Sequence, residues 1–467
     1  MTDGLGLGDA YGVTLGRIRE QGGEKARLGM AALMWISNSE RPLAADELCH
    51  ALSVKIGSPN LDADNVPSIG TLLACCQGLI AVEKETSTVR FIHFTVQEYL
   101  RVHFELFGSA HSTMAETCLN YLNSQQVKAL SPTYYSYFWN RDLQSTPFLE
   151  YSALYWGRHA KRQTSDRAKF LALKLFEDDN NGMLTRIILE EYGYYTFHVS
   201  FDTRPPFSGL HCACLFGIIE IVASLVEAEG CDVNREDCVG NTPLLWAAKN
   251  GHEGVVEFLL GLDGIDPNKP DTYGKTPLSH AASAGREELV KILLQRDGLH
   301  PNKPDASGQT PLSYAIQYEH EGVVKILLGR DDFNPDEPDE SGRTQLSLAA
   351  ERGWERVVKV LLEREDVNPN GPDAGGQTPL SYAVRYEREG VVKMLLGRDD
   401  ISPDEPDELG RTQLSWAAQA GREGVVKILL ERDEVNPNKP DKLGRTPLWH
   451  ASEQGHDGVV ALLRKRI

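Results

Sequence analysis

The tripeptide Thr-Pro-Leu recurs with a period of 34 residues through the C-terminal half of this chain of 467 residues. A fixed period of this length is typical of supersecondary units that stack on one another and use their surface for recognition. Two units keep the spacing but begin Thr-Gln-Leu, and a degenerate unit precedes the first clear copy. The sequence therefore predicts an eight-unit solenoid over residues 207–467, with repeat helices that begin near residues 208, 242, 276, 310, 344, 378, 412 and 446.

The unit that starts at Asp407 shows what each repeat is expected to form. Residues 407–410 have turn composition, and the Thr412 hydroxyl is suited to cap the N-terminus of a helix. Gly421 is suited to the left-handed conformation that ends that helix. An apolar stripe at helical spacing then ends at Leu430, and the proline-rich residues 436–440 predict a loop. Each unit is therefore predicted to run turn, helix, helix, loop.

Two units carry a glutamate where this terminating glycine is expected. Glu319 and Glu387 lie 68 residues apart, and each follows a tyrosine. A side chain in the left-handed conformation costs on the order of 1 kcal/mol relative to glycine. We therefore predict that these two repeats are locally weaker. The 68-residue spacing also indicates duplication of a pair of repeats.

Four short motifs recur along the array: Asp-x-x-Gly-x-Thr-Pro-Leu, Ala-Ala, Gly-His as at Gly251-His252, and Val-Val-x-x-Leu-Leu. Together they resemble the ankyrin repeat over residues 208–467. The resemblance implies a preformed scaffold that binds a protein on the concave face, which turn tips and the exposed ends of the first helices form. Tyrosine and arginine often anchor interfaces, so we expect binding on the middle repeats, 310–411. The candidate positions on that face, which vary between units, are Thr272, Tyr273, Tyr318, Arg343, Glu351, Arg352, Arg385, Tyr386, Leu409 and Arg411.

The net charge restricts the partners that this array is expected to bind. The whole chain carries −19; residues 1–207 hold 19 Lys+Arg and 23 Asp+Glu, or −4, which leaves −15 on residues 208–467. An acidic surface repels phosphate backbones. We therefore expect no nucleic acid on the array, and a basic or mixed protein surface as its partner.

The cysteines and the apolar runs indicate an intracellular, cytoplasmic protein with no membrane partner. The eight cysteines show no zinc-ligand spacing, and no secretion signal begins the chain, so reduced thiols are expected. The longest apolar run, residues 28–36, is about half the length that a bilayer span needs.

Residues 10–108 are predicted to form a winged helix, of mixed α/β type. Helices are expected over 26–36, from Pro42, from Ser68 and from Phe94, with a hairpin of two strands over 79–83 and 88–94. Residues 109–206 are predicted to form a helical linker with its clearest helices at 113–122, 147–160 and 166–176, and a tyrosine-rich loop at 131–138. We expect this linker to cover the open edge of the first repeat.

Residues 41–48, 76–80 and 94–100 carry a second resemblance. They are similar to the winged helix of GPI inositol-deacylase type that follows the NACHT NTPase module in fungal NLR-like (STAND) ankyrin proteins. The resemblance implies the ligand-sensing half of such a receptor, with an NTPase module upstream or in trans. It also implies that this chain is the C-terminal part of the receptor or a shortened relative.

Several motifs that suggest catalysis, cofactors or metals have structural explanations. Gly274-Lys275-Thr276 lacks the earlier glycine of a phosphate-binding loop and lies on the repeat period. His211, Cys212 and Cys214 fall on packing positions of the first repeat, and acidic loops such as 331–339 lack the ligand spacing of a calcium loop. No G-x-S-x-G elbow supports an esterase. We therefore expect no enzyme, cofactor or metal site.

The predicted fold is mainly α: a winged helix, a helical linker and an ankyrin solenoid. The predicted function is a non-catalytic protein-binding scaffold. The alternative is a nucleic-acid-binding regulator that uses the winged helix; its presumed third helix, near residues 68–77, carries no positive charge. The third hypothesis is an enzyme that lacks a recognisable catalytic motif.

Overall fold

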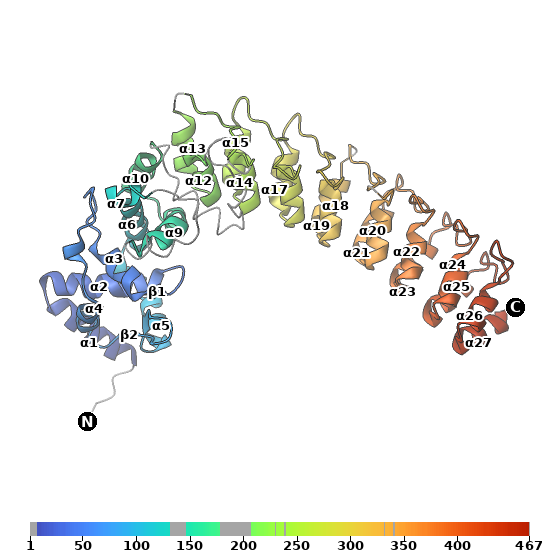
Figure 1. The fold of residues 1–467 in the computed structure, drawn as a ribbon, viewed down its shortest axis with the longest axis horizontal. Helices are drawn as coiled ribbons and strands as arrows, with labels where there is room; N and C mark the ends of the chain where they lie inside the picture. The colour runs from blue at the N-terminus through green and yellow to red at the C-terminus, as the bar shows by residue number, and fades with distance from the viewer. Residues whose placement is uncertain are drawn as a thin grey trace. The chain divides into compact units, whose positions relative to one another are not determined.

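The structure is a computed structural model that describes residues 7–130, 146–177, 207–228, 230–237, 240–330, 332–339 and 341–466. The loop predicted at 131–138 and the last part of the predicted linker lie outside these residues. Two compact units divide the chain, Met1–Val255 and Val256–Ile467, and the boundary falls within helix α15, Glu253–Leu260. Most elements of each unit are labelled in Figure 1.

The first part of unit 1 forms a helical domain with a small sheet. Helix α2 lies at its centre and contacts α1, α3, α4 and α5, because its apolar residues, such as Leu33 and Trp35, are buried on several sides. The three strands are antiparallel in the order β1-β3-β2, with Val89 of β3 opposite both Leu43 and Val82. The elements are α1 Leu7–Glu20, α2 Gly23–Asn38, β1 Leu43–Ala44, α3 Ala45–Ser53, α4 Ile69–Cys75, β2 Ile80–Val82, β3 Thr88–Phe91 and α5 Phe94–Val102.

Two features of this domain differ from the sequence prediction. The predicted second helix does not start at Pro42, because Leu43 is buried and pairs with Val89 as a third strand. The Glu47 carboxylate then accepts the Ala44 N–H at 2.8 Å and starts the helix at Ala45. Helix α1 was not predicted; it packs on α2 and buries Leu15 and Ile18.

The linker helices of unit 1 pack on the first repeat, as predicted. Trp156 of α9 meets Phe216 of α12 edge-on, with ring centroids 5.2 Å apart, and α10 contacts α12 and α13. Gly157 lies directly against the Phe216 ring. The linker helices are α6 Ala110–Leu122, α7 Gln125–Lys128, α9 Leu149–Arg162 and α10 Asp166–Phe176. The first repeat contains α12 Gly209–Phe216 and α13 Ile219–Val226, and the second begins with α14 Pro243–Asn250.

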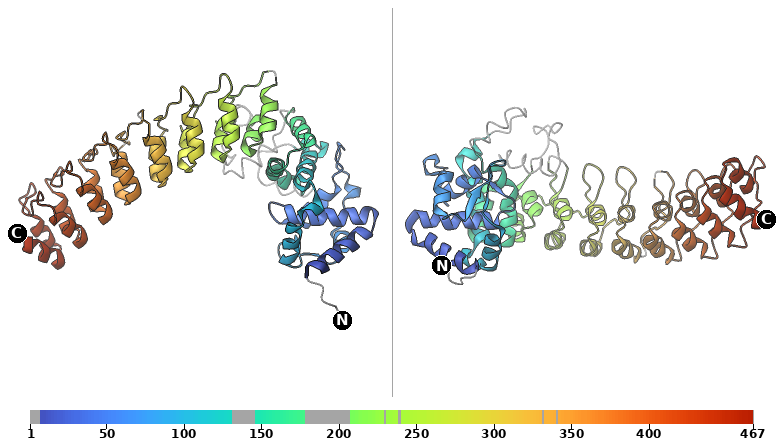
Figure 2. Two further views of the ribbon diagram at one scale, coloured as in Figure 1. Left: turned by 180° about the vertical axis from the view of Figure 1, so that it is seen from behind. Right: turned by 90° about the horizontal axis from the view of Figure 1, so that it is seen from below.

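Unit 2 consists of helix pairs whose connecting loops all lie along one edge (Figures 1 and 2). Each first helix contacts the first helices of neighbouring repeats, and each second helix contacts its neighbouring second helices. The first helices are α16 Pro277–Ser283, α18 Pro311–Gln317, α20 Gln345–Arg352, α22 Pro379–Arg385, α24 Gln413–Gln419 and α26 Pro447–Glu453. The second helices are α17 Glu287–Leu294, α19 Glu321–Leu328, α21 Glu355–Leu362, α23 Glu389–Leu396, α25 Glu423–Leu430 and α27 Asp457–Arg466.

The predicted caps set the bounds of the first helices. The Thr412 hydroxyl accepts the Ser415 N–H at 3.2 Å, and the threonines that open the other repeats of unit 2 cap in the same way. Gly421 has a φ of 69°, and Glu319 and Glu387 each have a φ of 58°. The two glutamates therefore adopt the left-handed conformation that the sequence predicted.

Replacing Glu319 or Glu387 by glycine should stabilise its repeat by about 1 kcal/mol, because glycine adopts a positive φ without strain. Amide hydrogen exchange in α18 and α22 measures the gain. The reciprocal change, Gly421→Glu, should weaken its repeat, since a Cβ there lies 2.7 Å from His456 Nδ1 in the next repeat. Faster exchange after Glu319→Gly contradicts this explanation.

The two Thr-Gln-Leu repeats use the glutamine to join neighbouring repeats. Gln345 and Gln413 stand where proline begins the other first helices of unit 2, and both are buried. Gln345 Nε2 donates to Ser313 Oγ at 3.0 Å, and Gln413 Nε2 donates to Ser381 Oγ at 3.0 Å. Each bond links the second member of the duplicated pair to the first.

Candidate functional site

One face of unit 2 is formed by the turn tips and the exposed side of the first helices; we call it the inner face. An aspartate fixes each tip, because its Oδ1 accepts two backbone N–H groups. Asp305, for example, accepts from Ser307 at 2.8 Å and from Gln309 at 2.9 Å. Asp271, Asp339, Asp373, Asp407 and Asp441 do the same. The tips are therefore rigid supports for the residues they present.

In the repeats of Asp271, Asp305, Asp373, Asp407 and Asp441, the second carboxylate oxygen joins the tip to its first helix. Tyr382 Oη donates to Asp373 at 2.6 Å, Trp416 Nε1 donates to Asp407 at 3.1 Å, and Tyr314 Oη bonds to Asp305. Burial raises the pKa of Tyr314, and its bond to Asp305 adds to that rise. This contact links each ring to the tip of its own repeat.

In the repeat of Asp339 the helix position is Leu348, which cannot donate a hydrogen bond. Arg343 replaces it: Nε donates to Asp339 Oδ2 at 2.9 Å, and a second nitrogen donates to Glu351 Oε2 at 3.0 Å. Burial alone would lower the pKa of Arg343, but these bonds outweigh burial and raise it. Arg343 and Glu351, both predicted as binding residues, are thus an ion pair that orients the Arg343 guanidinium.

A cavity of about 410 Å³ opens on the inner face between the repeats that begin at 276, 310 and 344. It brings together three of the predicted residues, Tyr318, Arg343 and Arg352. The cavity also includes Lys275, whose Nζ lies 4.2 Å from the centre of the Tyr314 ring. Sequence reasoning did not select Lys275 or Tyr314 as binding residues.

The other predicted residues lie outside this cavity. Tyr273, Tyr386 and Leu409 are 66%, 42% and 54% exposed. Arg385 and Arg411 meet at one ring, with their guanidinium carbons 5.7 and 3.7 Å from the centre of Trp416. Thr272 is exposed at a tip. All ten predicted positions are at least partly accessible to solvent.

Three apolar or aromatic residues that sequence reasoning passed over are also accessible: Trp416 partly, Leu443 at 74% and Trp449 at 44%. Leu443 occupies the tip position of Tyr273 and Leu409, so the same positional rule finds it. Trp449 stands where serine is buried in the preceding repeats. Its indole is exposed in the last repeat, with Arg445 5.2 Å from the ring centre.

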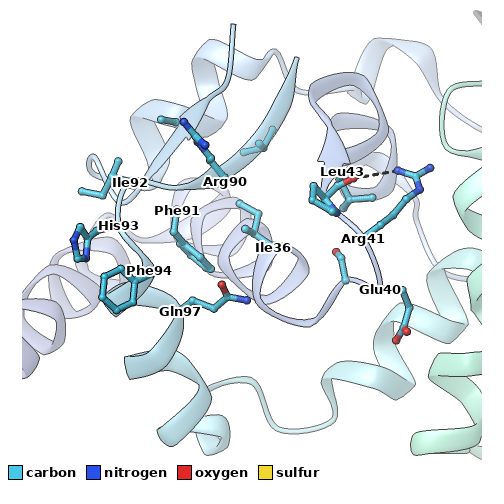
Figure 3. A pocket seen from close by; sticks show the side chains of 14 residues that line it. Ile36, Glu40, Arg41, Leu43, Arg90, Phe91, Ile92, His93, Phe94 and Gln97 are labelled. Carbon is cyan, nitrogen blue, oxygen red and sulfur yellow. Dashed lines mark hydrogen bonds between the residues drawn. The ribbon is translucent and has the colours of Figure 1, made fainter. Parts of the chain in front are cut away.

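A groove of about 710 Å³ crosses the N-terminal domain beside β3 and the start of α5 (Figure 3). Its two arginines are held by acids: Arg41 donates to Glu47 at 2.8 Å and Arg90 pairs with Glu83 at 2.8 Å. Helix α4, the presumed recognition helix, contains no basic residue. The groove and this helix therefore offer no unpaired Lys or Arg for phosphate contacts.

The motifs that suggested other chemistry have structural roles. Thr276 caps α16, and His211 is buried with its Nε2 donating to the Arg235 carbonyl at 2.9 Å. Burial lowers the pKa of His211, and Cys212 and Cys214 are buried free thiols. Among the described residues, no group of three His, Cys, Asp or Glu side chains is placed to hold a metal ion. Cys238 lies outside those residues.

Stacked helix pairs with rigid tips and a varied inner face define a helical repeat scaffold. Residues 178–271, 262–339, 330–407 and 400–467 match the family described as ankyrin repeats (3 copies). This match spans more than half of the chain, and the chain belongs to the ankyrin-repeat family. Residues 18–111 match a second family, the winged helix domain of GPI inositol-deacylase.

Among solved structures, the chain is similar to one described as the "crystal structure of the ankyrin repeat domain of Bcl-3: a unique member of the IkappaB protein family". The two are 26% identical, with a TM-score of 0.44, over 47% of this chain and 96% of that one. Ankyrin repeats are protein-binding scaffolds and are typically not catalytic. In the part of the chain that the structure describes, no helix has the length and apolar character to cross a membrane.

Proposed function

We propose that this protein binds a protein ligand on the inner face of its middle repeats, 310–411. The observation that carries the proposal is the cavity of about 410 Å³ lined by Tyr318, Arg343 and Arg352. Tyr318 is 52% exposed beside it, and Tyr386, the equivalent residue 68 positions later, is 42% exposed. Tyrosine has few rotatable bonds and loses little conformational entropy when it binds, and both tyrosine and arginine are residue types that often anchor interfaces.

We further propose that binding is coupled to an NTPase module of an NLR-like receptor, upstream of the winged helix or in trans. The order of the two matched families along the chain supports this role. Packing of the linker helices on the first repeat, with Trp156 against Phe216, gives a solid connection within unit 1. A ligand changes the activity of the NTPase only if the ligand binds two conformational states of the receptor with different affinity.

Replacing Tyr318, Arg352 and Tyr386 together by alanine should lower the affinity of the full chain for its ligand at least ~100-fold, because hot-spot residues of these types often contribute 2 kcal/mol or more each. The ligand is first isolated from lysate on the full chain, and its affinity for both chains is then measured by titration calorimetry. The matched control is Arg356→Ala on α21, whose side chain is 82% exposed on a second helix.

Equal affinity of the wild type and the triple variant, with unchanged thermal unfolding, refutes the proposed face. The coupling is tested separately on the native complex purified from source cells. Its NTP hydrolysis should change when the ligand is added to the wild type and not to the triple variant. Hydrolysis that ignores the ligand rules out the receptor role and leaves the scaffold role intact.

A further inference from the structure

Much of the acidic charge of the repeats in unit 2 lies outside the inner face. Glutamates begin the second helices, as at Glu321, Glu355 and Glu389. Aspartates in the loops that follow these helices pair with arginines, such as Asp400 with Arg398 at 2.7 Å. The tip aspartates accept hydrogen bonds from their own turns, and Asp407 and Asp441 also pair with an arginine of the tip. The net charge of the array is therefore a poor guide to the charge that a partner meets on the inner face.

The cavity at Tyr318 is one cationic part of that face. Its lining includes three cations, Lys275, Arg343 and Arg352, and one acid, Asp339, for a net of +2. Glu351, which pairs with Arg343 at 3.0 Å, reduces the local charge to +1. Among the described residues, neither Lys275 nor Arg352 forms an ion pair, and Lys275 contacts the Tyr314 ring at 4.2 Å.

A second cationic part lies in the next pair of repeats. The guanidinium carbons of Arg411 and Arg385 lie 3.7 and 5.7 Å from the centre of the same Trp416 ring. Asp407 pairs with Arg411 at 2.8 Å, and no acid among the described residues pairs with Arg385. Two cations at one ring repel each other, and an incoming carboxylate between them relieves that repulsion.

The two parts occupy corresponding places in the duplicated pairs of repeats. Tyr318 and Arg343 correspond to Tyr386 and Arg411, each 68 residues later. Each pair therefore carries an exposed tyrosine and an arginine that its tip aspartate holds. The cations of the two parts are not all equivalent, because Arg352 and Arg385 stand where Ala420 and Gln317 stand in the other pair. An extended segment that follows the inner face nevertheless meets cations twice, and two linked contacts raise its affinity.

We propose that the ligand of the inner face is an acidic protein segment whose aspartate or glutamate side chains bind Lys275 and Arg352 in the first part and Arg385 and Arg411 in the second. This inference rests on the proposed function, since it concerns the same face. It differs from the basic or mixed partner that the net charge of the array predicts. Aromatic rings beneath Lys275, Arg385 and Arg411 keep these three cations in place for the incoming carboxylates.

The test selects binders for the immobilised full chain from a displayed library of short random peptides. Selected peptides should be enriched in Asp and Glu relative to the unselected library. A labelled peptide from that set is then titrated with the wild type and with Arg352→Glu/Arg385→Glu, and affinity should fall ~10-fold for each reversed charge. Arg356→Glu is the matched reversal on a second helix, and Tyr318→Ala tests the face without changing its charge.

Each outcome decides between the charge inference and the binding face. Acidic peptides that lose affinity with the double reversal and keep it with Arg356→Glu support the inference. Peptides without acidic enrichment that still need Tyr318 overturn the charge inference and leave the binding face standing. Peptides that need neither Tyr318 nor the arginines overturn both. A short DNA duplex that binds equally tightly and needs the same arginines overturns the assignment to an acidic protein segment.

Discussion

Acidification from pH 7 to pH 5 is expected to loosen the packing of α6 on α9 in unit 1, because His159 is buried there as a neutral imidazole and takes up a proton only when this packing opens. His111 Nδ1 and His159 Nδ1 lie 2.9 Å apart, and His159 Nε2 lies 2.9 Å from Tyr151 Oη. Tyr151 Oη in turn accepts the Glu40 N–H at 3.1 Å. Burial, together with the neighbouring His111 and Arg162, lowers the pKa of His159 to about 3.

The direction of the pH effect follows from these pKa values. His159 is neutral in the folded state down to about pH 3, whereas an unfolded histidine takes up a proton near pH 6.5. The unfolded state therefore binds more protons between pH 6.5 and 3, and stability falls as the pH falls through that window. The loss is about 2 kcal/mol at pH 5, by the value of about 1.4 kcal/mol per pKa unit, and it grows as the pH falls toward 3.

Hydrogen exchange of α6 and α9, corrected for the intrinsic pH dependence of exchange, measures this loss. The substitution His159→Gln should remove most of the difference in exchange protection between pH 7 and pH 5, although this substitution also weakens the bond to Tyr151. His300→Gln, at an exposed position, should leave the difference unchanged. Protection in α6 and α9 that is equal at both pH values in the wild type contradicts the proposed role of His159.

Gly157→Ala is expected to disrupt the junction between the linker and the first repeat. A Cβ at Gly157 lies 2.0 Å from Cγ of Phe216, a distance that forces the ring or the helices to move. Phe216 is only 6% exposed, and Trp156 beside it is fully buried, so the ring has little room. Overpacking of this kind costs about 1–3 kcal/mol, and here it outweighs the gain of about 1 kcal/mol from alanine in a helix.

A double-mutant cycle separates this clash from a general effect of the substitution. In the Phe216→Leu background, Gly157→Ala should become neutral or stabilising, because the ring that it strikes is gone. Gly16→Ala is the matched control: that helical glycine has open space around its Cβ position, and the change should stabilise α1. Thermal unfolding of the full chain reports all four variants. If Gly157→Ala lowers stability equally in the wild type and in the Phe216→Leu variant, a clash with the Phe216 ring is refuted.

The array was largely predictable because its signals are local. The Thr412 cap, the positive φ of Gly421, Glu319 and Glu387, and the turn at Asp407 each depend on residues a few positions apart. The short strand at Leu43 was not predictable in this way, because its partner Val89 lies far along the chain. For the same reason a helix was predicted from Pro42, where the structure has a strand before Ala45.

The candidate binding face was predictable in position and less so in chemistry. The repeat register placed Tyr318, Arg352 and Tyr386 on an accessible face, since every unit repeats the same geometry. The pairing of Arg343 with Glu351, and the convergence of Arg385 and Arg411 on Trp416, depend on contacts within and between repeats. Lys275 could be recognised as part of the site only from the structure, which shows that it lines the cavity.

The sequence by itself determined the repeat, its caps and its strained glutamates, because a 34-residue period imposes one local structure on every unit. The tertiary structure decided how charge is distributed, since −15 for residues 208–467 says nothing about which face carries the acids. It also decided the acid sensitivity expected of unit 1. His111, Tyr151 and His159 come from two helices, and only their packing places the three side chains in one chain of hydrogen bonds.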